Sequence, residues 1–392
     1  MSSQWSPRTR RTLLATIGSG FVAGCTKTVF GQSNEPGGNS FECKKSKSVW
    51  PMGRHDPRQT GSSNRQFRFE NATDVSSMVA ESPITAEPTI TEEYVHFPTS
   101  AGGVVSMERQ RPQSRKRTEL ESRIRTPVAV GCGHIFVRTD RHLYCFDSKG
   151  DLTEPIWTSQ YPSGGVAPVL LYENLTLYGT TAGGVFAVDA EDGTEEWHHQ
   201  FSSGVVCRGI AANDCGLYAV VSSGRHATLF SLDRTDGTVN WSKKIETTVS
   251  ASPVAGRESV FVGTENGKVI ATGCEQGGTN WSEQVGTKIQ TDLAVDTTAE
   301  KLFAIDTGTS TLNAFEASTG NTLWSVTSKS HRIAPTVTEN SVLVAGGGDS
   351  LRALRKRTGE QITNWDTTVS TNVSVGLDRI YAGRDNELLV VE

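Results

Sequence analysis

A short segment that ends in tryptophan recurs along this chain, and its spacing limits the possible folds more than any other feature. The best-preserved copies, residues 185–197 and 229–241, read VFAVDAEDGTEEW and LFSLDRTDGTVNW. The six tryptophans, which follow one another at intervals of 40, 44, 40, 43 and 41 residues, are Trp157, Trp197, Trp241, Trp281, Trp324 and Trp365. Four copies carry a glycine four residues before the tryptophan, namely Gly193, Gly237, Gly277 and Gly320. A period in the low forties is typical of a repeat array.

Within one repeat the residues alternate as in short β-strands. Val185, Ala187 and Asp189 alternate with Phe186 and Val188, which we interpret as a strand. Asp192-Gly193 marks a turn, and a second strand starts near Trp197. Two more short apolar stretches, 167–172 and 176–179, come before them. Four strands in about 40–45 residues are the pattern of a β-propeller blade. Helical repeats of this length would need a period of 3.6 residues, which the chain does not show.

Eight such units fit between residue 50 and the C-terminal Glu392, because 343 residues over eight units give about 43 each. The eighth unit ends after residues 388–391 and therefore lacks its outer strand, whereas residues 65–79 offer a spare strand. We predict an all-β fold, an eight-bladed β-propeller of four-stranded antiparallel blades closed by this N-terminal strand. A seven-bladed ring is the alternative.

These motifs resemble a known repeat. Ala187, Asp189, Gly193 and Trp197 form the pattern Ala-x-Asp, Gly, Trp of the PQQ-like, or quinoprotein-type, propeller repeat family. The N-terminal stretch 50–61, with its Trp-Pro-Met, Asp and Thr-Gly, is similar to the first segment of stand-alone propellers of that family. The resemblance covers residues 50–392. It implies that each repeat tryptophan packs between neighbouring blades and that the turn ahead of it ties one blade to the next.

The first residues carry features of an export signal. Arg10 and Arg11 stand in TRRTLL, which matches a twin-arginine signal, and the apolar stretch 13–23 is too short to span a bilayer. It ends in FVAGC, which resembles a lipobox with Cys25 as the lipidated residue. We predict a twin-arginine signal peptide with lipobox over 1–25, a flexible linker over 26–49 and a propeller domain over 50–392. The alternative is an ordinary signal with an unmodified Cys25.

The remaining cysteines have two interpretations. An oxidising compartment permits disulfides, and the predicted blades place Cys132 near Cys145 and Cys207 near Cys215. The alternative is that these residues are single thiols buried in strands. The pairing does not follow from the sequence.

Two features of the enzymes in this family, an adjacent cysteine pair and long loops over the channel, are missing from the chain. The resemblance to quinoprotein dehydrogenases implies two adjacent cysteines against a quinone, an aspartate base, and Glu, Asn and Asp ligands to Ca²⁺. The chain has no Cys-Cys pair, and its turns are short. We therefore predict no catalytic, cofactor-binding or metal-binding residues.

Charge narrows the range of partners. A net charge of −5 argues against a general nucleic-acid binder. Residues 108–117 hold five cations, which form either a solvated loop or a basic patch, namely Arg109, Arg111, Arg115, Lys116 and Arg117. We predict a monomeric, lipid-anchored, non-catalytic scaffold on the extracytoplasmic face of the cell membrane, with an unknown protein partner. The alternative is a PQQ-dependent dehydrogenase-like enzyme or a small-ligand binder that uses the central channel.

Overall fold

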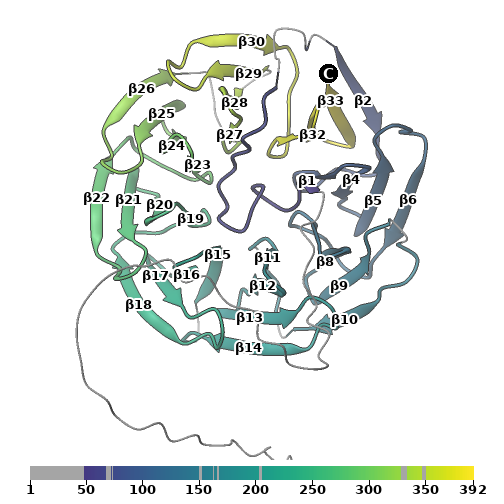
Figure 1. Ribbon diagram of the computed structural model, residues 1–392, viewed down its shortest axis with the longest axis horizontal. Helices are drawn as coiled ribbons and strands as arrows, with labels where there is room; N and C mark the ends of the chain where they lie inside the picture. Colours follow the sequence, from purple (N-terminus) through teal and green to yellow (C-terminus); the bar gives the residue numbers. More distant parts are fainter. Residues whose placement is uncertain are drawn as a thin grey trace, which may run out of the picture. The chain divides into compact units, whose positions relative to one another are not determined.

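The computed structural model describes residues 48–67, 72, 74–149, 152–161, 163–165, 167–202, 205–327, 333–346 and 350–392. The chain divides into two compact units, Met1–Phe41 and Glu42–Glu392, and all of the described residues belong to the second. Eight antiparallel sheets are arranged around a central axis as the blades of a β-propeller, as the sequence predicted (Figure 1). The described residues include no helix long and apolar enough to cross a membrane.

Blades 2 to 7 each contain four consecutive strands, with the first strand nearest the axis. The strands of blades 2 to 4 are β7 (Ala129–Gly131), β8 (His134–Arg138), β9 (His142–Asp147), β10 (Trp157–Gln160), β11 (Leu170–Tyr172), β12 (Leu175–Gly179), β13 (Gly184–Asp189), β14 (Glu195–Gln200), β15 (Val206–Asn213), β16 (Gly216–Ser223), β17 (His226–Leu232) and β18 (Val239–Ile245). Those of blades 5 to 7 are β19 (Val254–Ala255), β20 (Ser259–Gly263), β21 (Lys268–Gly273), β22 (Thr279–Gln284), β23 (Ala294–Asp296), β24 (Lys301–Asp306), β25 (Thr311–Glu316), β26 (Thr322–Thr327), β27 (Thr336–Val337), β28 (Ser341–Gly346), β29 (Ser350–Arg355) and β30 (Gln361–Trp365).

Blades 1 and 8 depart from this pattern because both use N-terminal residues. Blade 1 contains β3 (Thr89–Thr91), β4 (Tyr94–Pro98), β5 (Gly103–Glu108) and β6 (Arg115–Glu119), with β1 (Ser48–Trp50) added on its inner side. Blade 8 contains β31 (Ser374–Val375), β32 (Ile380–Arg384) and β33 (Glu387–Val391), and β2 (Val75–Val79) is its outer strand.

The pairing of β2 confirms that an N-terminal strand closes the ring. β2 runs antiparallel to β33, with Val75 opposite Val391 and Val79 opposite Glu387. The donated strand is shorter than the predicted 65–79, and Phe69 lies outside the described residues. β1 begins at Ser48, two residues ahead of the domain boundary predicted at residue 50.

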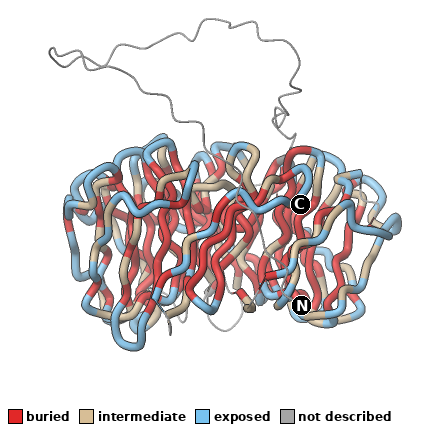
Figure 2. The backbone as a smooth tube through the Cα atoms, turned by 90° about the horizontal axis from the view of Figure 1, so that it is seen from below, coloured by how far each residue is buried: buried red, intermediate tan, exposed pale blue. Residues whose placement is uncertain are grey.

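The position of a strand in its blade determines its exposure. All five residues of β20, a second strand, are buried, because neighbouring blades cover both of its faces. The outer strand β26 has no buried residue and alternates between exposed and half-buried positions. Figure 2 shows the consequence from the side, with buried backbone through the middle of the ring and exposed residues mainly at the two loop-bearing faces. Each blade therefore gains its core only by stacking on its neighbours.

The repeat tryptophans join each blade to the next. Their indole Nε1–H groups donate to backbone carbonyls of the following blade, at distances of 2.9 to 3.4 Å from Trp157 to Trp324. The acceptors, in chain order, are Ala190, Arg234, Cys274, Ala317 and Lys356. Trp197 and Trp281 are buried, whereas Trp241 is only half-buried. Each ring thus packs against the next blade while its single donor is satisfied.

The repeat glycines provide the surface on which these rings lie. Gly193, Gly237, Gly277 and Gly320 have φ angles between +70° and +79°. A Cβ atom on any of them would collide with the indole of the preceding blade; at Gly277 it would lie 2.7 Å from Cδ2 of Trp241. Glycine is needed here both for its left-handed backbone and for its lack of a side chain.

We expect Gly277→Ala to lower the free energy of unfolding by about 2–4 kcal/mol, because it adds left-handed strain to a steric clash with Trp241. The adjacent Gly278 is a matched control, since a Cβ there would meet no atom within 4 Å. Gly278→Ala should change the unfolding free energy by less than about 1 kcal/mol. Denaturant titration of both variants checks this, and equal losses would show that the indole contact is not the cause.

Candidate functional site

A polar cavity of about 380 Å³ opens at the centre of the ring and is the candidate functional site. Residues from all eight blades line it, and most of them come just before the innermost strands. Its exposed polar residues are Thr85, Arg125, Arg208, Ser250, Gln290 and Ser370. Equivalent positions of the repeats therefore lie at the axis, and they carry different side chains. We call this cavity the cup.

An N-terminal segment, residues 50–65, crosses the centre of the ring and closes the channel (Figure 1). Its carbonyls accept hydrogen bonds from backbone N–H groups of the innermost strands of blades 2, 4, 5, 6 and 7. These bonds, of 2.6 to 2.9 Å, are donated by Val130, Ala212, Ala255, Val295 and Val337. We call this segment, residues 50–65, the plug. Its Gly53 lies against Pro127 and Pro168, which also line the cup. The cup is therefore open at one end only.

Glu87 connects the plug to the cup. It is 2% exposed, and its Oε1 accepts hydrogen bonds from the indole N–H of Trp50, at 3.3 Å, and from the backbone N–H of Arg54. Burial raises the pKa of its carboxyl above the ordinary value, although the charge of Arg54 opposes this. Oε2 has no hydrogen-bond partner, so it can carry the proton that burial favours.

Arg54 joins the plug to two further blades. Its side chain is 1% exposed, and Nη2 donates to the carbonyls of Leu293, at 3.0 Å, and Pro335, at 2.8 Å. Gly61 has a φ of +58°, and a side chain there would overlap the Arg54 guanidinium. The Arg54 guanidinium thus holds the plug against blades 6 and 7 through these two hydrogen bonds.

The cup residues do not match the quinone and Ca²⁺ site that the family resemblance implies. The sequence contains no adjacent cysteines. Within the described ranges, no three His, Cys, Asp or Glu side chains converge as metal ligands would. Asp292 accepts the backbone N–H of Ser252 through Oδ1 at 2.8 Å, and Glu87 holds the plug. Both carboxylates of the cup therefore already have structural partners.

The basic run of residues 108–117 does not act as one patch. Arg109 is buried and donates to the Tyr381 hydroxyl at 3.3 Å, to the Glu92 carbonyl at 3.0 Å and to the Asp378 carboxylate. It therefore ties blade 1 to blade 8. The other four cations lie on or near the surface, namely Arg111, Arg115, Lys116 and Arg117.

The disulfide pairs considered from the sequence are wrong. Cys215 pairs with Cys274, with 6.0 Å between Cα atoms, and this bond connects blades 4 and 5. Cys145 and Cys207 are free thiols buried within strands, where burial raises the pKa of each to about 12. Cys132 is disulfide-bonded, but not to the free Cys145. Pairing within a blade fails because Cys145 and Cys207 are buried within β9 and β15, whereas Cys215 lies in the turn between β15 and β16, where it meets Cys274 of the next blade.

The predicted export and lipidation residues, Arg10, Arg11 and Cys25, lie outside the described residues. The predicted repeat residues do not lie at the cup. They form the contacts between blades, whereas the cup and the plug come from positions that no repeat motif marks. The one signal for the plug in the sequence was the stretch beginning at Trp50, which resembled the start of stand-alone propellers.

Comparison with known families identifies the repeat. The model of the family described as outer membrane protein assembly factor BamB matches residues 153–301 and 275–390, which together make up more than half of the chain. The chain belongs to this family. A search of curated proteins finds no match to this chain.

Solved structures share the fold. BamB from Moraxella catarrhalis is 17% identical, with a TM-score of 0.65 over 82% of this chain and 98% of that one. Quinohemoprotein alcohol dehydrogenase from Comamonas testosteroni is 12% identical, with a TM-score of 0.71 over 89% and 81%. A europium-containing methanol dehydrogenase is 11% identical, with a TM-score of 0.70 over 87% and 91%. At these identities the likeness shows the fold alone.

The buried carboxyl of Glu87 leads to a prediction about pH. Its pKa is raised in the folded protein, so ionising it costs more there than in the unfolded chain. As pH rises through the folded-state pKa, the wild type should therefore lose stability relative to Glu87→Gln, whose amide oxygen can still accept from Trp50 and Arg54. Denaturant titrations from about pH 4 to 7 measure this difference.

The matched control is Glu196→Gln, since Glu196 is exposed on the outer strand β14. Its unfolding free energy should follow that of the wild type across the range. If the curves of the wild type and Glu87→Gln run parallel, Glu87 does not ionise in a buried state.

Proposed function

We propose that this protein is an exported, lipid-anchored and non-catalytic propeller that acts as a protein-interaction scaffold at the cell envelope. It would be held on the extracytoplasmic face of the membrane through lipid on Cys25, after export directed by Arg10 and Arg11. A soluble ring on a lipid anchor can meet other envelope proteins while it stays close to the bilayer.

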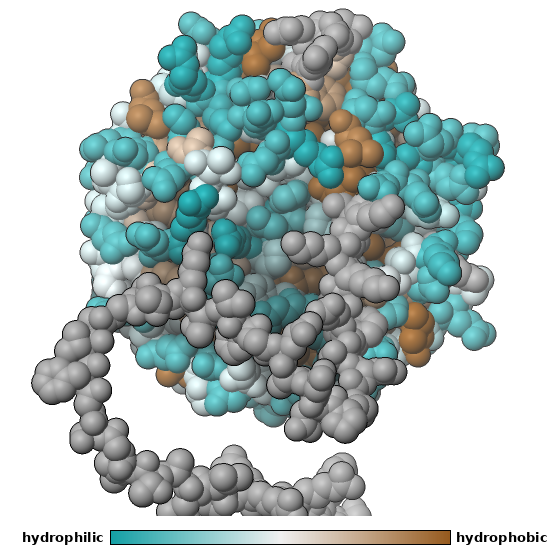
Figure 3. Space-filling view, viewed as in Figure 1, coloured by the Kyte–Doolittle hydropathy of each residue, from teal (hydrophilic) through white to brown (hydrophobic). Residues whose placement is uncertain are grey.

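Family membership supports this location and role. The family is described as an outer membrane protein assembly factor, a description that fits protein–protein interaction at the envelope. The surface also supports it. Figure 3 shows a mostly hydrophilic face on which hydrophobic side chains are scattered, as expected for a ring surrounded by water.

The observation that carries the non-catalytic proposal is the plug. Residues 50–65 close the channel through bonds to five blades, and Glu87 and Arg54 are used to hold them. In an enzyme of this shape we would expect acid, base or nucleophile side chains that converge on one reacting atom. The cup instead offers single polar side chains spread around a ring.

A dehydrogenase-like redox enzyme is the second candidate, favoured by the structural likeness to a quinohemoprotein alcohol dehydrogenase and a europium-containing methanol dehydrogenase. We expect the purified protein to show no turnover of alcohols or sugars with added quinone, Ca²⁺ and an electron acceptor, because the chain has no adjacent cysteines for the quinone and both carboxylates of the cup have structural partners. Cross-linking in native membranes followed by mass spectrometry should instead recover a defined protein partner. Quinone-dependent turnover without such a partner would replace the scaffold proposal with the enzyme.

Export and anchoring can be tested separately. Cys25→Ser should release the protein from the membrane or leave it unprocessed, because the lipid would have no attachment site. Replacing Arg10 and Arg11 together by lysine should block export of the folded chain, which cell fractionation and immunoblotting measure. Arg123→Lys, an exposed residue of the propeller, is the control and should be exported normally. Normal export of the double variant would contradict the twin-arginine assignment.

A further inference from the structure

One position of the repeat lies at the contact with the preceding blade, and three blades place a cation there. In blades 3 to 7 it is the residue whose carbonyl accepts the repeat tryptophan of the preceding blade. Arg234, at this position of blade 4, forms an ion pair of 3.7 Å with Glu173 of blade 3 and donates to the Tyr172 hydroxyl. Lys356 of blade 7 pairs with Asp296 of blade 6. The cation of one blade thus neutralises a carboxylate of the blade before it.

Blade 1 shows the same arrangement with a buried arginine. The N–H of Arg109 donates at 2.8 Å to the carbonyl of Glu93, in the turn between the first two repeat strands of its blade. In blade 6 the N–H of Ala317 makes the equivalent bond, also at 2.8 Å. The Arg109 side chain is buried between blades 8 and 1 and donates to the Asp378 carboxylate and the Tyr381 hydroxyl. A guanidinium therefore occupies the space between these two blades.

Blades 5 and 6, which are neighbours in the ring (Figure 1), have the partners of this arginine but not the arginine itself. Phe261 of blade 5 corresponds to Tyr381 of blade 8, because each pairs with the first residue of its innermost strand. Glu258 and Asp378 each lie three residues before that ring. Blade 6, however, has alanine at the arginine position, Ala317. A methyl group thus stands where a guanidinium lies between blades 8 and 1.

A cavity of about 270 Å³ lies at this junction of blades 5 and 6. Phe261 and Ala317, which are both buried, form part of its lining. Glu258 of blade 5 and Glu300 of blade 6 also line it and are exposed. Within the part of the chain that the structure describes, neither carboxylate forms an ion pair or accepts a hydrogen bond. The cavity therefore combines an apolar wall with two unpartnered carboxylates.

The charges around the cavity favour a cation. Its third carboxylate, Asp296, already pairs with Lys356. The one cation among the lining residues is Arg257, which is exposed and, in the described ranges, forms no ion pair. Two free carboxylates therefore face one arginine, and the balance of charge at the cavity is negative.

We infer that this cavity is a docking site for an arginine side chain of a partner protein. The guanidinium pairs with Glu258 and lies against the Phe261 ring, while its alkyl chain passes Ala317. Arginine fits better than lysine, because its planar group lies on a ring and donates to a carboxylate at once. At the rim, the exposed Asn280 and Ser318 offer hydrogen-bonding groups to the partner's backbone. This inference rests on the proposed scaffold function and names the partner group that the scaffold recognises.

Two matched probes test the chemistry of the cavity. They are the N-acetyl methylamides of arginine and of citrulline, which have nearly the same shape but differ in charge. We expect saturable binding of the arginine probe by saturation-transfer-difference NMR spectroscopy. The citrulline probe should bind at least about tenfold more weakly, because it brings no charge to the carboxylates. Added salt should weaken the binding of the arginine probe.

Two variants and two controls locate the site. Ala317→Arg supplies the guanidinium that blade 1 has and should weaken probe binding at least about tenfold, because the cavity is then filled. Glu258→Gln keeps the cavity and should weaken binding through charge alone. Ala190→Arg, at the equivalent position of blade 3, and Glu275→Gln, in an exposed turn of blade 5, are the matched controls and should bind as the wild type does. If Ala317→Arg does not fold, Glu258→Gln, a change at an exposed residue, decides the test.

Cross-linking in native membranes tests whether the occupant belongs to a partner protein. The wild type and both controls should capture a defined partner, and Ala317→Arg and Glu258→Gln should capture it at least about tenfold less.

Three results would overturn the inference. One is no binding of the arginine probe. Another is equal probe binding by the wild type and both cavity variants. The third is capture of the same partner by cavity variants that no longer bind the probe, which would make the cavity a site for a free guanidino compound. In that case the scaffold proposal stands and the docking site is wrong. If the wild type captures no partner at all, the scaffold proposal itself is wrong, whatever the probe does.

Discussion

The contact between each repeat indole and the glycine turn of the next blade is the interaction on which the rest of the ring depends. Neither side of a single blade is polar enough to face water, since second strands such as β20 are buried throughout. Each blade must therefore be held face to face with two others. The indole of Trp241 holds two blades together by packing on Gly277, which has no side chain to keep the indole away. Its Nε1–H also donates to the carbonyl of Cys274 in the same turn. Packing and hydrogen bonding thus select one stacking register.

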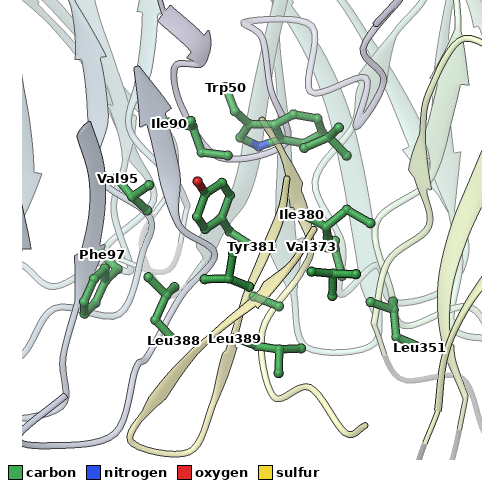
Figure 4. Close-up of a cluster of buried hydrophobic side chains, with 14 of the residues drawn as sticks. Trp50, Ile90, Val95, Phe97, Leu351, Val373, Ile380, Tyr381, Leu388 and Leu389 are labelled. Carbon is green, nitrogen blue, oxygen red and sulfur yellow. The ribbon is translucent and has the colours of Figure 1, made fainter. Parts of the chain in front are cut away.

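A ring built from such contacts must close where the repeat ends, and different residues do this. Trp365 of blade 7 finds no glycine turn in blade 8 and donates instead to the carbonyl of Ala72, ahead of β2, at 2.7 Å. Between blades 8 and 1, Arg109 bonds to Tyr381 and Asp378 and takes over the role of a docking tryptophan. Figure 4 shows Tyr381 among apolar residues of both blades at this junction.

The sequence predicted the parts of the structure that repeat. The tryptophan period predicted eight blades, and the missing last strand predicted closure by an N-terminal one, because both follow from local patterns that occur many times. It did not predict that Arg109 is buried, because a cation among other cations looks solvated until its partner 269 residues away is known. Nor did it predict the Cys215–Cys274 bond, since pairing depends on how neighbouring blades are aligned. The cup and the plug are equally non-local, as each draws on many blades at once.

The same reasoning indicates where specific recognition can evolve in such a ring. A residue at a contact between blades cannot change freely. At Gly193 and Gly277, for example, any side chain would collide with the indole of the preceding blade. Positions whose residue differs from the equivalent residue of the other repeats do not have this steric constraint. Glu87 at the axis and Ala80 at the closing seam are two such positions, and each borders a cavity. Glu87 is committed to holding the plug, which needs its Oε1 in place as a hydrogen-bond acceptor. Ala80 is itself buried in the apolar cluster at the closing seam, so the small size of its side chain, rather than a loss of burial, distinguishes this position.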